Sequence, residues 1–441
     1  MPAGYEIDAS YDPTSLTFKA RSRVSIAPRT VVDSFAFDLH SELQVTSVKV
    51  GGTELDCKQE TVFYPANYSM TANEVTCPSR GVDLSRGIEI AYEGMINRSV
   101  VRGMSEYYRG DSTGLYMRGW ASVLWMPIFL KDAMSFPPAP RVHAVLRAPK
   151  DFTSIMAGSY AGHRIEGGQG VDEWTAEGLA YYDLQYATHA YARVEAPHIT
   201  VFSFSDAASL KSARAIAGFT GEVLARYGQL YRNSPSSDRS TYIIELPEYG
   251  DIASGNVFGV QEKRWREFSL GSKSAVTLAH ELVHPFVQMR TPAGDPLYAL
   301  SIEGAPSYFM IPVVAELRGG HDYDDRLDDV QKKYLERRKA GAKDEDGPLP
   351  PEKPLFAMTV SDVGIYKDRF VLADRALLFW DYMRRRMGAA RFDAWVKDIT
   401  NAQRMTASDF YASILRHAPR LLPDAHVWLD TSEYPERFRR G

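Results

Sequence analysis

Residues 274–284 read SAVTLAHELVH, and this stretch decides how the rest of the chain is interpreted. Its apolar residues recur at helical spacing, which predicts a buried helix. On such a helix His280 and His284 lie one turn apart on the same face, where two imidazoles can share one Zn²⁺. Glu281 lies between them, close enough to act as a general base toward water at that metal. Pro285 follows at once and removes a helical N–H, so we expect it to kink the helix.

A zinc site that performs catalysis needs a third protein ligand, with a fourth position left open for water. Glu303 follows His284 after 18 intervening residues and opens the next predicted helix, EGAPSYFMIP. An HExxH string occurs by chance in roughly one chain in a hundred, and a pair of histidines that only pack is the alternative. The added glutamate favours one zinc ion per chain, held by His280, His284 and Glu303.

An HExxH string followed by 18 residues and a glutamate resembles the signature of the gluzincin metallopeptidases of the aminopeptidase N and leukotriene epoxide hydrolase type. The resemblance extends over nearly the whole chain. It is carried by residues 5–26, 114–127, 192–202 and 243–248, with Met126 where the family has tyrosine in a Trp-Tyr-Pro sequence. It implies an N-terminal β saddle followed by a thermolysin-like α+β catalytic domain, without the family's C-terminal helical domain.

The change in sequence pattern agrees with two domains. Residues 1–197 contain runs in which apolar and polar residues alternate, such as LTFKARSRVSIAP, and these predict an antiparallel sandwich or saddle. Residues 198–441 contain a predicted strand, TYIIELPE, and many runs with apolar residues at helical spacing, which predict an α+β or an all-α domain. The fold class that we expect is therefore multidomain, with the boundary between residues 197 and 198.

The resemblance also implies a segment that binds the substrate. The family carries a Gly-x-Met-Glu-Asn strand whose glutamate holds the α-amine of the peptide. The best register places this strand on residues 254–259, so that Gly255 and Asn256 contact the substrate and Asn256 stands in place of the carboxylate. An amide binds an ammonium group less well, because a charge-assisted contact is lost. A later register would place Glu262 there instead.

A tyrosine of the family stabilises the oxyanion of the tetrahedral intermediate. Tyr366, in DVGIYKDRF, is the residue that we assign to this role. A strict count back from the helix FWDYMRRRMG lands near Ala373, and a packing or surface tyrosine is the alternative.

The overall composition excludes some classes of partner. Apolar residues make up 44% and charged residues 24% of 441 residues, which is the balance of a folded globular protein. The formal net charge of −5 offers no basic field for nucleic acid or an anionic membrane. The longest uncharged apolar run, at residues 119–130, is too short to span a bilayer. We therefore expect neither nucleic acid nor a membrane as a partner, and the resemblance implies a peptide or a small amide as the substrate.

The chain has two cysteines, Cys57 and Cys77. They are either two separate thiols or a disulfide that closes one β-hairpin. The first residues, MPAGYEIDAS, show no signal peptide, which favours a cytoplasmic location and leaves a secreted or periplasmic one open if a leader was removed.

The function that we expect is hydrolysis of peptide bonds by metal-activated water, most simply as an aminopeptidase. Two alternatives remain open. One is a zinc hydrolase of the same fold whose substrate has no free α-amine, such as a blocked peptide, a small amide or an epoxide. The other is a non-catalytic peptide-binding protein, which the intact HELVH and Glu303 disfavour.

Overall fold

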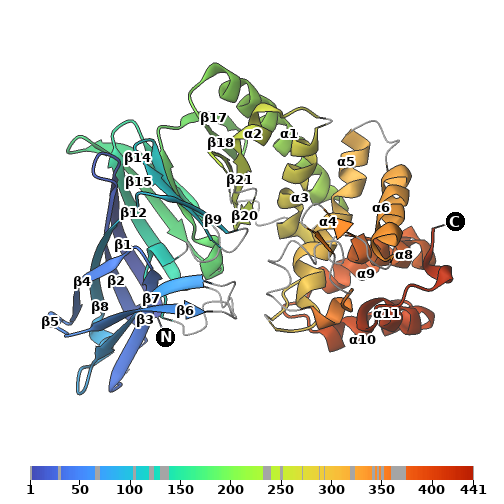
Figure 1. Cartoon of the computed structure of the whole chain (residues 1–441), viewed down its shortest axis with the longest axis horizontal. Helices are drawn as coiled ribbons and strands as arrows, with labels where there is room; N and C mark the ends of the chain where they lie inside the picture. Colours follow the sequence, from blue (N-terminus) through green and yellow to red (C-terminus); the bar gives the residue numbers. More distant parts are fainter. Residues whose placement is uncertain are drawn as a thin grey trace. The chain divides into compact units, whose positions relative to one another are not determined.

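The chain forms two compact units that combine sheets and helices (Figure 1). The first contains residues 1–217 and 238–266, and the second contains residues 218–237 and 267–441, so the division falls within helix α1 (Ala207–Tyr231). The boundary that we expect between the saddle and the catalytic domain, after residue 197, does not coincide with this division and remains a prediction. The computed structural model describes residues 2–27, 31–64, 70–102, 106–118, 124–129, 139–231, 240–248, 252–270, 272–287, 289–292, 294–317, 323–339, 343–344, 347–348, 352–358 and 374–440.

The largest sheet of the first unit has eight strands, in the order β14-β15-β12-β1-β2-β8-β4-β5. Strand β1 pairs in parallel with β12, and the other neighbours are antiparallel. The strands are β1 (Pro2–Asp12), β2 (Thr17–Ile26), β4 (Gln44–Val50), β5 (Thr53–Glu54), β8 (Ile88–Met95), β12 (Arg141–Pro149), β14 (Ser159–Glu166) and β15 (Gln169–Ala176). Buried and exposed residues alternate along β1 and β2, as the sequence pattern predicts.

The exposed face of this sheet carries a row of charged side chains that lie opposite one another on six strands. In order across the sheet, the row is His143, Glu6, Arg23, Glu89, Lys49 and Glu54. Opposite charges on directly paired strands stabilise a sheet, so the row supports this register. Hydrogen bonds to Glu173 and Glu6 raise the pKa of His143.

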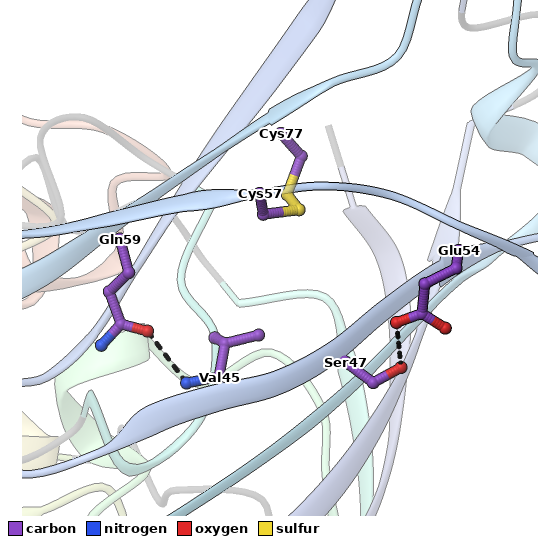
Figure 2. Close-up of a disulfide and its surroundings, with 6 residues drawn as sticks. All are labelled: Val45, Ser47, Glu54, Cys57, Gln59 and Cys77. Carbon is purple, nitrogen blue, oxygen red and sulfur yellow. Dashed lines mark hydrogen bonds between the residues drawn. A yellow bond between two sulfur atoms is a disulfide. The ribbon is translucent and has the colours of Figure 1, made fainter.

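A smaller sheet, ordered β3-β7-β6, contains the disulfide Cys57–Cys77 (Figure 2). Lys58 pairs with Thr76, so the two cysteines face each other at the end of the β6–β7 hairpin, with their Cα atoms 4.3 Å apart. Of the two possibilities that the sequence left open, separate thiols or a disulfide that closes a hairpin, the structure shows the disulfide. The strands are β3 (Ser34–His40), β6 (Lys58–Tyr64) and β7 (Met70–Pro78).

The described part of the first unit also contains two five-stranded sheets, in the orders β13-β16-β11-β10-β9 and β17-β18-β19-β21-β20. Within the second of these, β18, β19 and β21 are parallel, and an antiparallel strand lies at each edge. The first sheet has strands β9 (Ser99–Arg102), β10 (Glu106–Asp111), β11 (Gly114–Arg118), β13 (Thr153–Met156) and β16 (Tyr186–His189). The second has β17 (Ala192–Ala196), β18 (Ile199–Ser203), β19 (Thr241–Leu246), β20 (Ile252–Ser254) and β21 (Val257–Gln261).

The second unit consists mainly of helices that pack around an aromatic core. Phe309, Trp380, Trp395 and Phe410 form a chain of ring contacts with centroids 5.2 to 5.5 Å apart. The helices are α3 (Lys273–Val287), α4 (Ala305–Phe309), α5 (Ile311–Leu317), α6 (Tyr323–Arg337), α8 (Ala376–Met387), α9 (Ala389–Asn401), α10 (Ala407–His417) and α11 (Leu422–Asp430). Among the described residues, we find no helix long and apolar enough to cross a membrane.

Candidate metal centre

Helix α3 presents the two histidines of the HELVH motif. Leu278, Leu282 and Phe286 recur at helical spacing and are buried, which orients the helix. The imidazole rings of His280 and His284 lie one turn apart, with centroids separated by 5.0 Å. The helix continues through Pro285 as far as Val287, so the proline does not end it.

Four polar side chains converge at this point of the second unit. The Nε2 atoms of His280 and His284 are 3.3 Å apart, and Glu303 Oε2 is 3.4 Å from His280 Nε2. Glu281 Oε2 is 3.9 Å from His284 Nε2. All four side chains are largely buried, with exposed fractions of 12 to 16%. The structure therefore brings together every residue that the sequence assigns to the metal.

Two separations between donor atoms, both measured from His280 Nε2, have the length that a zinc ion requires. Ligand atoms about 2.0 to 2.1 Å from a tetrahedral ion are separated from one another by about 3.4 Å. The Nε2–Nε2 and Nε2–Oε2 distances are both close to this value. Two nitrogens and a carboxylate oxygen are also the donor types that zinc accepts. The donor types and the two separations from His280 thus suit Zn²⁺. The described side chains whose donor atoms all lie within 4.8 Å of one another are His280, Glu281 and His284, and Glu303 reaches this group through His280.

The environment of His284 keeps its imidazole neutral. Burial, and then the neighbouring His280, lower the pKa of His284 to about 4, while Glu303 acts in the opposite direction. A histidine must be neutral to offer a lone pair to a metal. The ring is therefore ready to act as a ligand at neutral pH.

Glu303 lies on a segment that the sequence pattern did not predict. Residues Leu300–Gly304 form a π-helix, η5, which runs directly into α4. The hydroxyl of Ser301, two residues before Glu303, donates a hydrogen bond of 2.9 Å to the carbonyl of Met289, just beyond α3. Tyr298 is buried nearby, and its burial and the charge of Glu303 raise its pKa. Short π-helical turns are frequent at functional sites.

Gly255 and Asn256 belong to the first unit, where they form the two-residue turn between β20 and β21. Gly255 has a φ of +59°, and glycine is favoured at the first central position of such a hairpin turn. The Asn256 amide donates to the carbonyls of Gly158 and Ser240 at 2.8 and 2.7 Å, and accepts from the N–H of Gly158 at 2.8 Å. Asn256 therefore has a structural role within the first unit, and its contact with a substrate remains a prediction.

Two further predictions concern the tyrosine for the oxyanion and the alternative residue for binding the α-amine. Tyr366 and the alternative position Ala373 lie outside the described residues. Glu262 begins helix α2 (Glu262–Arg266), where its carboxylate lies 2.7 Å from the Arg266 guanidinium.

The sequence of this chain matches no protein-family model and no curated protein. Its fold is similar to that of the M1 zinc metallopeptidase from Deinococcus radiodurans, with a TM-score of 0.72 at 14% identity over 100% of this chain and 96% of that chain. A mutant of that enzyme bound to a Tyr-Ser-Ala substrate gives a TM-score of 0.68 at 14% identity over 98% and 95% of the two chains. At this identity the similarity establishes the fold, and it confirms the multidomain α+β class.

Proposed function

We propose that this chain is a zinc-dependent metallopeptidase, with zinc held by His280, His284 and Glu303. The observation that carries the proposal is the approach of His284 Nε2 and Glu303 Oε2 to His280 Nε2, at 3.3 and 3.4 Å. The similarity in fold to M1 zinc metallopeptidases supports it. We also propose that the β-rich part corresponds to the saddle of that family and the zinc-binding part to its thermolysin-like catalytic domain.

The proposed chemistry is hydrolysis of an amide bond. When bound, zinc supplies Lewis-acid chemistry, which acidifies water and polarises a carbonyl group. The Glu281 carboxylate, beside His284, takes a proton from the attacking water and passes it to the leaving nitrogen. Tyr366 donates a hydrogen bond to the oxyanion, and the kinetics of Tyr366→Phe test this role through a fall in kcat.

The first candidate activity is that of an aminopeptidase. A mutant of the Deinococcus enzyme binds a Tyr-Ser-Ala substrate, and a mutant two-domain M1 zinc metallopeptidase of similar fold binds L-arginine and L-tryptophan, which supports peptides as the substrate class here. The second candidate is hydrolysis of substrates without a free α-amine, and Asn256 favours it. Its amide is neutral, and three of its hydrogen bonds are made to the backbone of the first unit.

Metal content and substrate preference can be measured on the same preparations. We expect close to one zinc per chain in the wild type, and loss of most of it in His280→Ala and His284→Ala. His426→Ala is the matched control, because His426 lies on α11 with its side chain 49% exposed and should leave the zinc content unchanged. Full zinc in both site variants would refute the assignment.

Fluorogenic aminoacyl amides, offered with free and with acetylated α-amines, then separate the two activities. Cleavage confined to free amines supports the aminopeptidase. Cleavage of both forms within about tenfold supports the second candidate, because a neutral amide discriminates weakly between an ammonium group and an acylated nitrogen. A zinc-loaded protein that cleaves neither form would favour peptide binding without catalysis.

A further inference from the structure

Two tyrosines on helix α1 each bind a different helix of the second unit. The Tyr227 hydroxyl donates a hydrogen bond of 2.8 Å to the carbonyl of Ala279 on α3. The Tyr231 hydroxyl donates one of 2.7 Å to the carbonyl of Phe309 on α4. Residues four apart lie on the same face of a helix, so one face of α1 contacts both helices.

Each tyrosine also packs its ring against the helix that its hydroxyl binds. The rings of Tyr227 and Phe286 on α3 have centroids 5.5 Å apart, and those of Tyr231 and Phe309 on α4 are 5.4 Å apart. Burial raises the pKa of both tyrosines, so both hydroxyls remain protonated donors. Each contact therefore combines a hydrogen bond with ring packing.

The two carbonyls lie close to the metal-binding residues in the chain. Ala279 directly precedes His280 on α3. Phe309 is the last residue of α4, which continues from the π-helix that carries Glu303, and the carbonyls at the end of a helix lack intrahelical partners. The contacts of α1 thus reach both segments from which the zinc donors arise.

We propose that Tyr227 and Tyr231 are positioning residues for the metal site. Acting in series through α1, they brace α3, which carries His280 and His284, against the segment that carries Glu303, in addition to the direct contact of α3 with α4 and the Ser301–Met289 hydrogen bond. This inference rests on the proposed zinc site. It predicts that the hydroxyls contribute to zinc affinity, because they hold the donors at the spacing that the ion needs.

Tyr227→Phe, Tyr231→Phe and the double variant test the proposal, because they remove the hydroxyls and retain the rings. The measurements are the zinc dissociation constant, by competition with a chromogenic chelator, and the stability of the zinc-free protein in urea. We expect each single variant to bind zinc about threefold to tenfold more weakly. The double variant should resemble the weaker single variant, because breaking either of two links in series releases the whole brace through α1.

Tyr334→Phe on α6 is the matched control. Its hydroxyl lies 2.5 Å from Glu352, so this variant loses a buried tyrosine hydroxyl in the same unit. It should lower stability in urea and leave zinc affinity unchanged. An equal loss of zinc affinity in Tyr334→Phe would show a general loosening and overturn the proposal.

Other outcomes are also decisive. Wild-type affinity in both single variants, or losses that multiply in the double variant, would overturn the series arrangement. If Tyr227→Phe does not fold, Tyr231→Phe decides the question alone, because that side chain is less deeply buried. A wild type that binds no stoichiometric zinc would instead refute the zinc site itself.

Discussion

Glu281 shares helix α3 with two proposed zinc ligands, but we assign it a different task. If it moves protons, Glu281→Gln should keep the fold and the zinc content, since the amide is almost the same size. The rate of hydrolysis should fall roughly 100- to 10,000-fold. Zinc content and kcat of one preparation check both statements. Glu316→Gln is the control, because it alters a half-exposed carboxylate on α5. If Glu281→Gln keeps activity within a few-fold of wild type, the general base must be another residue.

Asn256 offers a second test at the scale of one side chain. Asn256→Ala removes the partners of one N–H and two carbonyl groups, which lie partly buried in the first unit. Each lost hydrogen bond costs about 1 kcal/mol, so we expect the free energy of unfolding to fall by about 2 to 3 kcal/mol. Urea denaturation measures this, with Asn401→Ala at an exposed position as the control. An unchanged midpoint would show that these bonds add nothing.

The two sites differ in how far sequence alone could predict them. His280, Glu281 and His284 lie within one helical turn and a half, so the helical period alone places them together. The partners of Asn256 include Gly158, which is 98 residues away, and they depend on how strands pair. Sequence patterns within a short window carry no information about such pairing.

At the scale of elements, the β6–β7 hairpin makes the clearest prediction. Its disulfide closes a loop with a sequence separation of 20 residues, and a loop of this size contributes about 3 kcal/mol, largely through the unfolded chain. Replacing both cysteines by serine should therefore lower the free energy of unfolding by about this amount. The zinc content should not change, since the hairpin belongs to the first unit. Urea curves of the variant and of reduced wild type should coincide; a variant as stable as oxidised wild type would contradict the prediction.

Other elements show which features of the fold cannot be predicted from local sequence patterns. Alternation along residues 16–28 predicts a strand, and residues 17–26 do form β2. The parallel partner of β1 is β12, more than a hundred residues later, and no local pattern reveals that pairing. The π-helix at Glu303 is similarly hidden, because one extra residue in a turn leaves the apolar spacing almost unchanged.

For the whole molecule, buried histidines predict sensitivity to acid. Burial lowers the pKa of His40 to about 3 and that of His189 to about 4. Below pH 6.5 the unfolded chain binds protons that the folded chain does not, so stability is present above pH 6.5 and is lost as the pH falls toward 4. The loss approaches about 1.4 kcal/mol per pH unit for each histidine. Unfolding midpoints at pH 7, 6, 5 and 4 measure it.

His189→Phe should reduce this acid sensitivity. The His189 ring already packs against the rings of Phe204 and Tyr191, with centroids 4.7 and 5.2 Å away, so a phenyl ring suits the position. The variant should lose less stability than wild type between pH 7 and pH 4. His426→Phe, at a half-exposed site, should behave as wild type. Equal slopes in all three proteins would show that His189 does not control acid unfolding.

The turn at Gly255 and Asn256 also limits how the substrate specificity of this protein can evolve. Asn256→Glu would turn a carboxylate toward the carbonyls of Gly158 and Ser240, which now receive the amide protons. Acceptors would then face acceptors, and folding would suffer before any new substrate could be selected. A carboxylate can enter this turn only after neighbouring backbone has shifted to receive it. The order of mutations, and not only their number, therefore limits which substrates the descendants of this protein can reach.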